Sequence, residues 1–337
     1  MISPKKKTIL VTGGCGFIGS HIVDKLIKNQ NEVIVLDNLS TGSIKNLNSD
    51  AILYQGDARN EFFIQKIFEQ YKFDYVIHQA AKINTNVLQE VPLNDIRNTL
   101  ESTIVLAKNC IKHNVKNLIF ASSVAVYGRP KSLPVKESSS LNPIYSYGIA
   151  KKVAEEYLKY FNIYYNLNYQ VLRYSNVYGP RQPIFGEVGV IAIFTDRIIQ
   201  EKELIIYGDG EQQRDYIFVE DIVRGLVSCA LLGNPGEAYN LASGAETSIK
   251  DLADLINELT KNKQPHDMKE PRDWDNSGKR FGSTEKSMKE LSFKTHYDLK
   301  EGLKKTVAWT QQDKIQSVIK SNFQRHVKNL PELKKYF

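Results

Sequence analysis

A glycine-rich turn between a strand-like and a helix-like stretch constrains the fold of this chain more than any other feature. Residues 13–19 read Gly-Gly-Cys-Gly-Phe-Ile-Gly, after the apolar run 8–12 and at the start of an amphipathic stretch, 17–29. Glycine suits a turn whose backbone must approach a phosphate group, and the N-terminus of the following helix supplies free N–H groups and a positive dipole. A purely structural glycine turn is the alternative, and the flanking strand and helix patterns argue against it.

An acidic residue lies at the end of the next predicted strand. Asp37 follows the turn by about twenty residues, the spacing at which a carboxylate binds a ribose 2′-hydroxyl. No arginine accompanies it in Asp37-Asn38-Leu39, so the sequence favours NAD over NADP. Asp57, within Gly-Asp-Ala, has two interpretations that the residues leave open: a contact to the adenine amino group, or the N-cap of the next helix.

Short β-branched runs alternate with longer amphipathic stretches over the first half of the chain. Strands are predicted at 8–12, 32–37, 51–55, 75–78, 117–122 and 170–174, and helices at 17–29, 60–71, 94–113 and 147–165. This alternation is typical of βαβ units. The sequence therefore predicts an α/β fold with a doubly wound parallel sheet, the Rossmann arrangement, and a smaller C-terminal α+β substrate domain.

The regular pattern ends after Asn176, where Pro180, Pro183, Gly186 and Gly189 lie close together. We expect an NAD-binding domain over residues 1–175, a substrate-binding domain over 176–320 and a C-terminal extension over 321–337. A helix at 218–232 and a short strand at 238–241 are expected to return part of 215–245 to the sheet. The basic, polar stretch 261–289 is expected to be the least structured.

Composition restricts the partners. The 337 residues include 45 Lys and Arg against 38 Asp and Glu, and the net charge of +7 favours anionic ligands in general. The chain has no basic stripe interleaved with aromatic residues of the kind that binds single-stranded nucleic acid. Cys15, Cys110 and Cys229 show no paired spacing for disulfides or zinc. With no signal peptide and no apolar run of ~18–20 residues, we expect a cytoplasmic protein without nucleic-acid, membrane or metal partners.

A tyrosine and a lysine share one face of the fourth predicted helix. Tyr147 and Lys151 are four residues apart, and a nearby ammonium favours phenolate over phenol, which suits proton exchange with a hydroxyl. The spacing alone arises often by chance. Ser123 follows the fifth predicted strand, at the edge of the sheet where doubly wound proteins bind ligands. Its hydroxyl is expected to converge with the Tyr147 phenol; the alternative is that the serine merely ends the strand.

These motifs occur in the order typical of the extended short-chain dehydrogenase/reductases. The matching residues are 13–19, Asp37, Asp57, His78-Gln79-Ala80-Ala81, Asn98, Ser123, Tyr147 with Lys151, 173–180, 208–210 and Arg214-Asp215-Tyr216. To about Trp309, the chain resembles the nucleotide-sugar epimerase/dehydratase branch of this family, and most of all the UDP-hexose 4-epimerases.

The resemblance implies a mechanism and a tightly held NAD. In the enzymes that this chain resembles, the tyrosine removes the proton of the sugar O4 while NAD takes hydride from C4, and hydride then returns to the other face of the 4-keto sugar. Tyr147 would be the base, Lys151 would tune it and bind the nicotinamide ribose, and Ser123 would hydrogen-bond O4. The residues implied for NAD are Gly13, Gly16, Phe17, Ile18, Gly19, Asp37, Asn38, Asp57, Ala58, Ala80, Ala81, Asn98, Tyr147, Lys151 and Tyr174.

The resemblance also implies a nucleotide-sugar site. Its residues would be Ser123, Tyr147, Asn176, Val190, Arg214, Tyr216, Arg272 and Arg280. Arginine forks make paired bonds to phosphate oxygens, which suits Arg214 and Arg272, although a surface salt bridge is an even alternative for Arg272. Arg280 stands where the family often has a smaller or aromatic residue beside the hexose. It indicates an acidic or phosphorylated sugar, or else a side chain directed to solvent; Lys82 and Glu101 also depart from the family.

The reaction type rests on two positions after Ser123. Dehydratases of the branch carry an Asp-Glu pair there, and decarboxylases carry a glutamate two residues before the equivalent of Tyr127. This chain has Val124 and Ala125, which cannot transfer protons, so 4-epimerisation of the UDP-glucose/UDP-galactose type is favoured. The alternatives are C4 oxidoreduction or dehydration, including of an acidic or unusual sugar. A non-enzymatic NAD-sensing or RNA-binding role is disfavoured by the intact Ser123, Tyr147 and Lys151.

A homodimer is implied by the same family. In many relatives the helices equivalent to 94–113 and 147–165 pair across a two-fold axis. An apolar stripe suits such a face and comprises Val153, Tyr157, Tyr160, Phe161 and Tyr164. Packing of this stripe within its own domain is the alternative.

Overall fold

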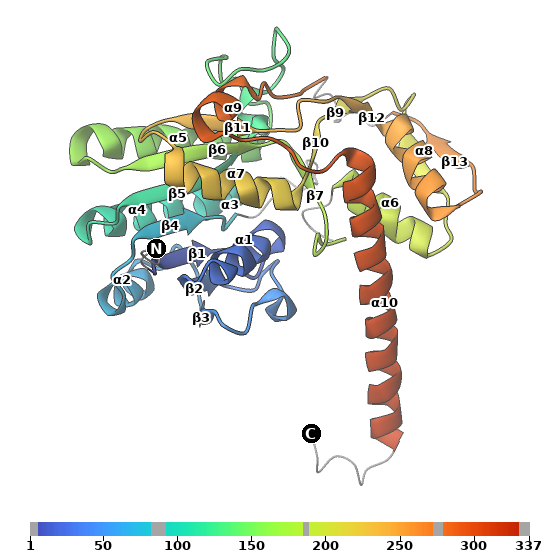
Figure 1. Ribbon diagram of the computed structural model, residues 1–337, viewed down its shortest axis with the longest axis horizontal. Helices are drawn as coiled ribbons and strands as arrows, with labels where there is room; N and C mark the ends of the chain where they lie inside the picture. Colours follow the sequence, from blue (N-terminus) through green and yellow to red (C-terminus); the bar gives the residue numbers. More distant parts are fainter. Residues whose placement is uncertain (1–5, 82–91, 185–188, 272–278, 330–337) are drawn as a thin grey trace, which may run out of the picture.

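A seven-stranded parallel sheet lies at the centre of the computed structural model, which describes residues 6–81, 92–184, 189–271 and 279–329 (Figure 1). Its strands are β1 (Thr8–Thr12), β2 (Glu32–Asp37), β3 (Ile52–Gln55), β4 (Tyr75–His78), β5 (Asn117–Ser123), β6 (Tyr169–Tyr174) and β11 (Ala238–Leu241). They are ordered β11-β6-β5-β4-β1-β2-β3, and every neighbouring pair is parallel. The doubly wound α/β fold predicted from the alternating pattern is confirmed.

Two apolar cores cover the two faces of this sheet. Successive residues of a strand point to opposite faces, so Ile9 and Val11 pack in one core and Leu10 packs in the other. The first core contains α1 (Phe17–Lys28) and α7 (Val219–Leu232), and the second contains α2 (Glu61–Gln70), α4 (Ser102–Lys112) and α5 (Ser146–Tyr165) (Figure 1). With both faces covered, ligands have access to the sheet only at the strand ends.

The helix predicted at 94–113 is divided in the structure. It consists of α3 (Pro92–Ile96), a π-helical turn, η2 (Arg97–Glu101), and α4. The hydroxyls of Ser102 and Thr103 donate to the carbonyl oxygens of Asn98 and Thr99, each over 2.6 Å. Such side-chain bonds compete with regular helical hydrogen bonds, which explains why the 3.6-residue pattern did not reveal the wider turn.

A third apolar core lies outside the large sheet. Three pairs of short strands contribute to this part of the chain: β7 (Asn176–Tyr178) with β10 (Tyr216–Phe218), β9 (Gln213–Arg214) with β12 (Thr247–Ser248), and β8 (Leu204–Tyr207) with β13 (His266–Lys269). The helices here are α6 (Val190–Ile199), α8 (Ile249–Thr260) and α10 (Leu299–Asn329). Phe194, Leu252 and Leu303 bring these three helices into one core. The N-terminal part of α10 packs there, and its C-terminal part projects from the body (Figure 1).

The prediction that 261–289 is the least structured stretch is wrong for part of its length. Residues His266–Lys269 form β13, which pairs in parallel with β8, and α9 (Glu285–Leu291) begins at Glu285. Backbone hydrogen bonds hold β13, whereas its side chains are mostly polar, so no apolar alternation marks the strand. Among the described residues, no helix is both long and apolar enough to cross a membrane.

Candidate active site

The glycine-rich turn lies at the point where the strand order reverses. β1 and β4 are neighbours in the sheet but lead to opposite sides of it, so the chain segments after these strands diverge and leave a crevice. A Cβ on Gly19 would lie 2.0 Å from the carbonyl oxygen of Gly13, so only glycine lets the first turn of α1 pack this closely. Gly16 is the N-cap of α1 and offers no side-chain cap, which leaves the first N–H groups of α1 for a ligand.

Asp37 is held rigidly beside this crevice. Its carboxylate accepts the backbone N–H groups of Cys15 over 2.9 Å and of Leu39 over 2.8 Å. The first contact joins the end of β2 to the glycine-rich turn. The carboxylate therefore has a fixed orientation along the crevice, which fits the predicted recognition of a ribose.

Asp57 is not the N-cap of α2, so that interpretation is wrong. Asn60 caps the helix by accepting the N–H of Phe63, because it directly precedes the first helical residue. Asp57 instead forms an ion pair with Arg59 over 2.5 Å, and the hydrogen bonds from Arg59 hold the pKa of Asp57 below its usual range. It also borders the crevice, so the adenine contact stays a prediction.

Most of the residues predicted for NAD surround one pocket. It is lined by Gly13, Gly16, Phe17, Ile18, Gly19, Asp37, Asn38, Asp57, Ala58, Ala80, Ala81 and Asn98, together with Leu36, Ser40, Thr41, Gly56, Gln79, Ser102 and Pro183. The latter group was not predicted. Ser40, Thr41 and Gly56 lie within three residues of predicted positions and could have been found from spacing, whereas Pro183 arrives from beyond β7 and carries no sequence signal.

Tyr174 differs from the other residues predicted for NAD. It is buried in the sheet and is not among the residues that line this pocket. Its phenol oxygen accepts a hydrogen bond from Gln79 Nε2 over 3.1 Å, and Gln79 does line the pocket. The structure thus places Tyr174 behind the pocket wall, and burial raises the pKa of its phenol.

A buried histidine connects the two chain segments that border the pocket. His78 Nδ1 lies 2.7 Å from the Thr12 hydroxyl, which accepts the N–H of Ala80, and His78 Nε2 lies 3.2 Å from the Ser102 hydroxyl, which donates to the Asn98 carbonyl. Burial and the nearby Lys151 ammonium lower the pKa of His78 to about 3, so the imidazole is neutral. A neutral ring bonded at both nitrogens fixes Ala80 and Asn98 relative to each other.

The predicted catalytic residues lie at the end of β5, the strand next to β4, and on α5 beside it. Lys151 is buried, its Nζ donates to the Ala121 carbonyl over 2.7 Å, and it lies 5.7 Å from the centroid of the Tyr147 ring. Ser123 Oγ accepts the N–H of Ala125 over 3.1 Å, which starts the short 3₁₀ turn η3 (Val124–Tyr127) and leaves the serine proton for another acceptor. Ser123 thus ends the strand and still presents a donor.

Gly148 allows the tyrosine to approach this turn and was not predicted. A Cβ at Gly148 would lie 2.7 Å from the carbonyl oxygen of Ala125, two residues after Ser123. Only a glycine beside Tyr147 therefore lets the first turn of α5 contact η3. Its place directly after the tyrosine is a signal that could have found it.

A second pocket gathers four of the residues predicted for the nucleotide sugar, whereas Ser123, Tyr147 and Arg280 do not line it. Asn176, Val190, Arg214 and Tyr216 line it, with Gln182 and Gln212 among the unpredicted residues. Asp215, which was not predicted as a site residue, supports Asn176 through its backbone. Its carbonyl oxygen accepts both the backbone N–H and the Nδ2 of Asn176, each over 3.0 Å. The Asp215 side chain is fully buried and accepts N–H groups of Ser243 and Gly244, and burial raises its pKa.

Arg280 lies next to Arg214, because their backbones form an isolated parallel bridge. Arg280 is partly buried, so the structure places its backbone beside the second pocket rather than on a distant surface. Arg272 and Lys82 lie outside the described residues.

Comparisons with known proteins agree with this geometry. Residues 9–242 match the family model "NAD dependent epimerase/dehydratase family". The chain belongs to this family. It is therefore an NAD-dependent enzyme, as the crevice with its glycine turn and fixed carboxylate indicates.

Three relatives illustrate the similarity. The chain is 42% identical to a putative UDP-glucose 4-epimerase of Methanocaldococcus jannaschii, over 89% of this chain and 97% of the relative. It superposes on the crystal structure of UDP-glucose 4-epimerase with UDP-glucose from Thermotoga maritima with a TM-score of 0.88 and 40% identity, covering 91% and 99% of the two chains. A UDP-N-acetylglucosamine 4-epimerase of Methanobrevibacter ruminantium, in complex with UDP-N-acetylmuramic acid, gives a TM-score of 0.86 and 34% identity, covering 92% and 100%.

Proposed function

We propose that this protein is an NAD-dependent epimerase that inverts C4 of a nucleotide-diphosphate sugar of the UDP-glucose/UDP-galactose type. The observation that carries the proposal is the position of β5 in the sheet. On one side lies β4, whose following residues line the first pocket, and on the other lies β6, which leads to Asn176 in the second pocket. This order supports the proposal that Ser123 acts between the two pockets, together with the Tyr147–Lys151 pair that α5 holds against β5 and η3.

The chain supplies positioning and proton transfer. NAD, when bound, accepts a hydride from the sugar C4 and returns it. Tyr147 takes the proton of the sugar O4 and later gives it back, while Ser123 donates a hydrogen bond to the same oxygen. The Lys151 ammonium favours the tyrosine anion and would hold the nicotinamide ribose. Because the redox change cancels over one turnover, the cofactor stays bound and is not consumed.

The diphosphate is held on the other side of the sugar. Arg214 offers a planar fork that makes paired bonds to phosphate oxygens, and Asn176 supplies an amide beside it. Arg272 is proposed as a second guanidinium for the same group. Val124 and Ala125 follow Ser123 with side chains that cannot transfer protons, which supports epimerisation over dehydration or decarboxylation.

The experiment is an incubation of the purified protein, without added cofactor, with UDP-glucose, UDP-galactose and their N-acetyl and uronate counterparts. We expect interconversion of at least one C4 pair, detected by chromatography or NMR, and release of NAD on denaturation. No interconversion of any pair contradicts the proposal. Turnover that consumes added NAD in proportion to product indicates net C4 oxidoreduction instead.

A second candidate substrate is an acidic nucleotide sugar. It is favoured by Arg280, whose backbone lies beside Arg214, and by the relative whose structure is in complex with UDP-N-acetylmuramic acid, a sugar with a carboxylate. The reaction and the catalytic residues stay the same. A higher kcat/KM for the uronate pair than for the neutral pair, reversed in Arg280→Leu, is the expected result for this candidate.

We also propose a cytoplasmic homodimer. Tyr157, Tyr160 and Tyr164 of the predicted stripe are 40%, 43% and 70% exposed on α5, which suits a partner surface, whereas Phe161 packs into its own core. The three cysteines are free and buried, which suits a reducing compartment. Light scattering is expected to give twice the mass of one chain, and a monomer at micromolar concentration contradicts the dimer.

A further inference from the structure

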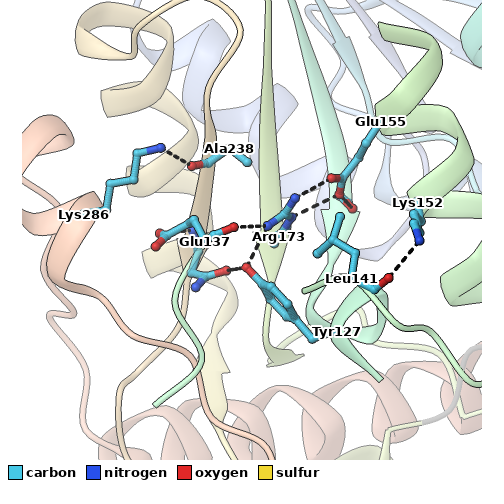
Figure 2. Close-up of polar contacts among 10 residues, drawn as sticks. Tyr127, Glu137, Leu141, Lys152, Glu155, Arg173, Ala238 and Lys286 are labelled. Atoms are coloured by element: carbon cyan, nitrogen blue, oxygen red, sulfur yellow. Dashed lines mark hydrogen bonds and ion pairs between the residues drawn. The ribbon is translucent and has the colours of Figure 1, made fainter. Parts of the chain in front are cut away.

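A chain of buried polar side chains extends from α5 to the segment that carries Arg280. It begins one helical turn beyond Lys151, at Glu155, which lies on the same face of α5 as Tyr147 and Lys151 because these residues are spaced by four. Figure 2 shows Arg173 of β6 directed at Glu155 on one side and at Tyr127 on the other. Glu155 and Arg173 are only 7% and 5% exposed, so the chain is shielded from water.

The side chains of Glu155 on α5 and Arg173 on β6 form a bidentate ion pair. Arg173 Nη2 lies 2.6 Å from Glu155 Oε2, and Nε lies 3.2 Å from Oε1. The Ser122 hydroxyl donates to the same Oε1 over 2.5 Å, directly before Ser123 in β5. Glu155 thus ties the helix of the proposed base to the strand end of the proposed O4 donor.

Tyr127 extends the chain away from the helix. Its phenol oxygen accepts Arg173 Nη1 over 2.9 Å and donates to Asn240 Oδ1 of β11 over 2.7 Å. Burial raises the pKa of Tyr127 to about 12, so the phenol keeps the proton that it donates to Asn240. One hydroxyl therefore joins β6 to β11 through side chains.

Asn240 connects the network to Val135 and Glu137 and, through Val135, to residues 281–283. Its Nδ2 donates to the Val135 carbonyl over 2.9 Å, and its backbone N–H donates to Glu137 Oε1 over 2.8 Å. The Val135 N–H donates to the Phe281 carbonyl and the Val135 carbonyl accepts the Ser283 N–H, over 2.9 and 2.8 Å. Residues 281–283 directly follow Arg280, whose backbone bridges Arg214.

A buried ion pair with hydrogen-bonded neighbours adds little to the free energy of unfolding by itself. Burying two charges carries a desolvation cost that the ion pair often only offsets, and apolar residues of similar volume frequently stabilise a core as well or better. What a fully satisfied buried network does provide is a fixed geometry between the elements that it joins. Here those elements are the helix of the proposed base and the segment of the proposed sugar site.

We propose that the Glu155–Arg173–Tyr127–Asn240 network positions α5 against residues 280–283, so that its members are positioning residues for the epimerisation. The inference rests on the proposed function. Tyr147 must meet a hydroxyl on a sugar whose diphosphate is held by Arg214, and small errors in this distance lower the rate of proton transfer steeply. The network fixes the two ends of that distance without contacting the substrate.

Tyr127→Phe is the sharpest variant, because it removes one oxygen and keeps the ring. Tyr169→Phe is the matched control: Tyr169 is a buried tyrosine like Tyr127, lies in β6 and packs in the core that contains α5, and the hydrogen bonds that join the four network residues do not involve its phenol. Turnover of UDP-galactose, retained NAD and thermal unfolding are measured for both. We expect Tyr127→Phe to lower kcat roughly tenfold with NAD retained, and Tyr169→Phe to stay within about twofold of wild type.

A double-mutant cycle separates positioning from general stability. Arg280→Ala is combined with each tyrosine variant, and kcat/KM is compared with the product of the single effects. We expect a deviation of about threefold or more with Tyr127→Phe and none with Tyr169→Phe. Multiplicative effects in both pairs, or an unchanged kcat in Tyr127→Phe, overturn the proposal.

Amide hydrogen exchange tests the network without reference to activity. In Tyr127→Phe we expect faster exchange both at 146–151 and at 280–283, and in Tyr169→Phe at neither. Exchange that changes at one end alone, or at neither end, overturns the network. Failure of the wild-type protein to epimerise any sugar overturns the proposed function instead, and the exchange result still decides whether the two segments are joined.

Discussion

The cofactor pocket and the sugar-nucleotide pocket are built by different means. The proposed cofactor pocket lies at the end of a continuous parallel sheet, and its predicted contacts come from backbone groups, glycines and one fixed carboxylate, Asp37. The sugar-nucleotide pocket is bordered by two-residue and three-residue strands, and its predicted contacts are long side chains such as Arg214. A backbone site depends on packing geometry, whereas a side-chain site depends on individual functional groups, so substitutions in the two are expected to fail in different ways.

The largest effect is expected between the two pockets. Tyr147→Phe removes the only proposed proton acceptor while leaving the ring, so kcat should fall about a thousandfold, the scale of general acid–base catalysis. Bound NAD, measured after denaturation, should be unchanged. Tyr165→Phe at the far end of the same helix, 50% exposed and outside the proposed dimer stripe, is the control and should retain full activity. If Tyr147→Phe keeps wild-type turnover, the base has been assigned to the wrong residue.

A substitution that clashes with the backbone of the glycine-rich turn should weaken NAD binding without changing the sugar-nucleotide pocket. In Gly19→Ala the new methyl would lie 2.0 Å from the Gly13 carbonyl, so α1 must shift away from the turn and NAD affinity should fall roughly hundredfold. Gly16→Ala meets its nearest backbone atom at 3.2 Å and should lose less. Equilibrium dialysis with NAD ranks the two variants, and equal affinities would show that packing of the turn does not govern binding.

The buried histidine makes the cofactor side sensitive to acid. His78 is neutral in the folded protein because burial lowers its pKa to about 3, whereas the unfolded chain takes up a proton near pH 6.5. The unfolded state therefore binds more protons between these values, and stability is lost as the pH falls through this window.

From pH 7.5 to pH 5.0 the contribution of His78 to that loss is about 2 kcal/mol. Urea unfolding of wild type and His78→Asn at both pH values measures it, with exposed His296→Asn as the control. The pH-dependent loss should shrink in His78→Asn only. An identical loss in all three proteins would mean that His78 is not the responsible group.

The smallest effect is expected when lysine replaces arginine in the sugar-nucleotide pocket. Arg214→Lys keeps the positive charge but loses the planar fork, so KM for the nucleotide sugar should rise about tenfold with kcat and NAD content little changed. Steady-state kinetics separate the two constants. A change in NAD content would contradict the independence of the two pockets.

The same contrast explains what the sequence could and could not reveal. The turn at 13–19, Asp37 and the order of β1 to β6 follow from local patterns, because each strand and helix repeats its own apolar period. The wall formed by Pro183 and the support that Asp215 gives to Asn176 depend on segments that meet only in the folded chain. The π-helical turn and β13 were missed because hydroxyl and backbone hydrogen bonds, which leave no periodic trace, hold them.

In the proposed mechanism one hydride leaves C4 and returns to C4 while the cofactor stays bound. The most direct test is incubation of the protein with UDP-galactose carrying deuterium at C4, in ordinary water and without added NAD. We predict that UDP-glucose forms with the deuterium still at C4. Loss of the deuterium to solvent, its appearance in free cofactor, or the absence of any C4 inversion would contradict the account.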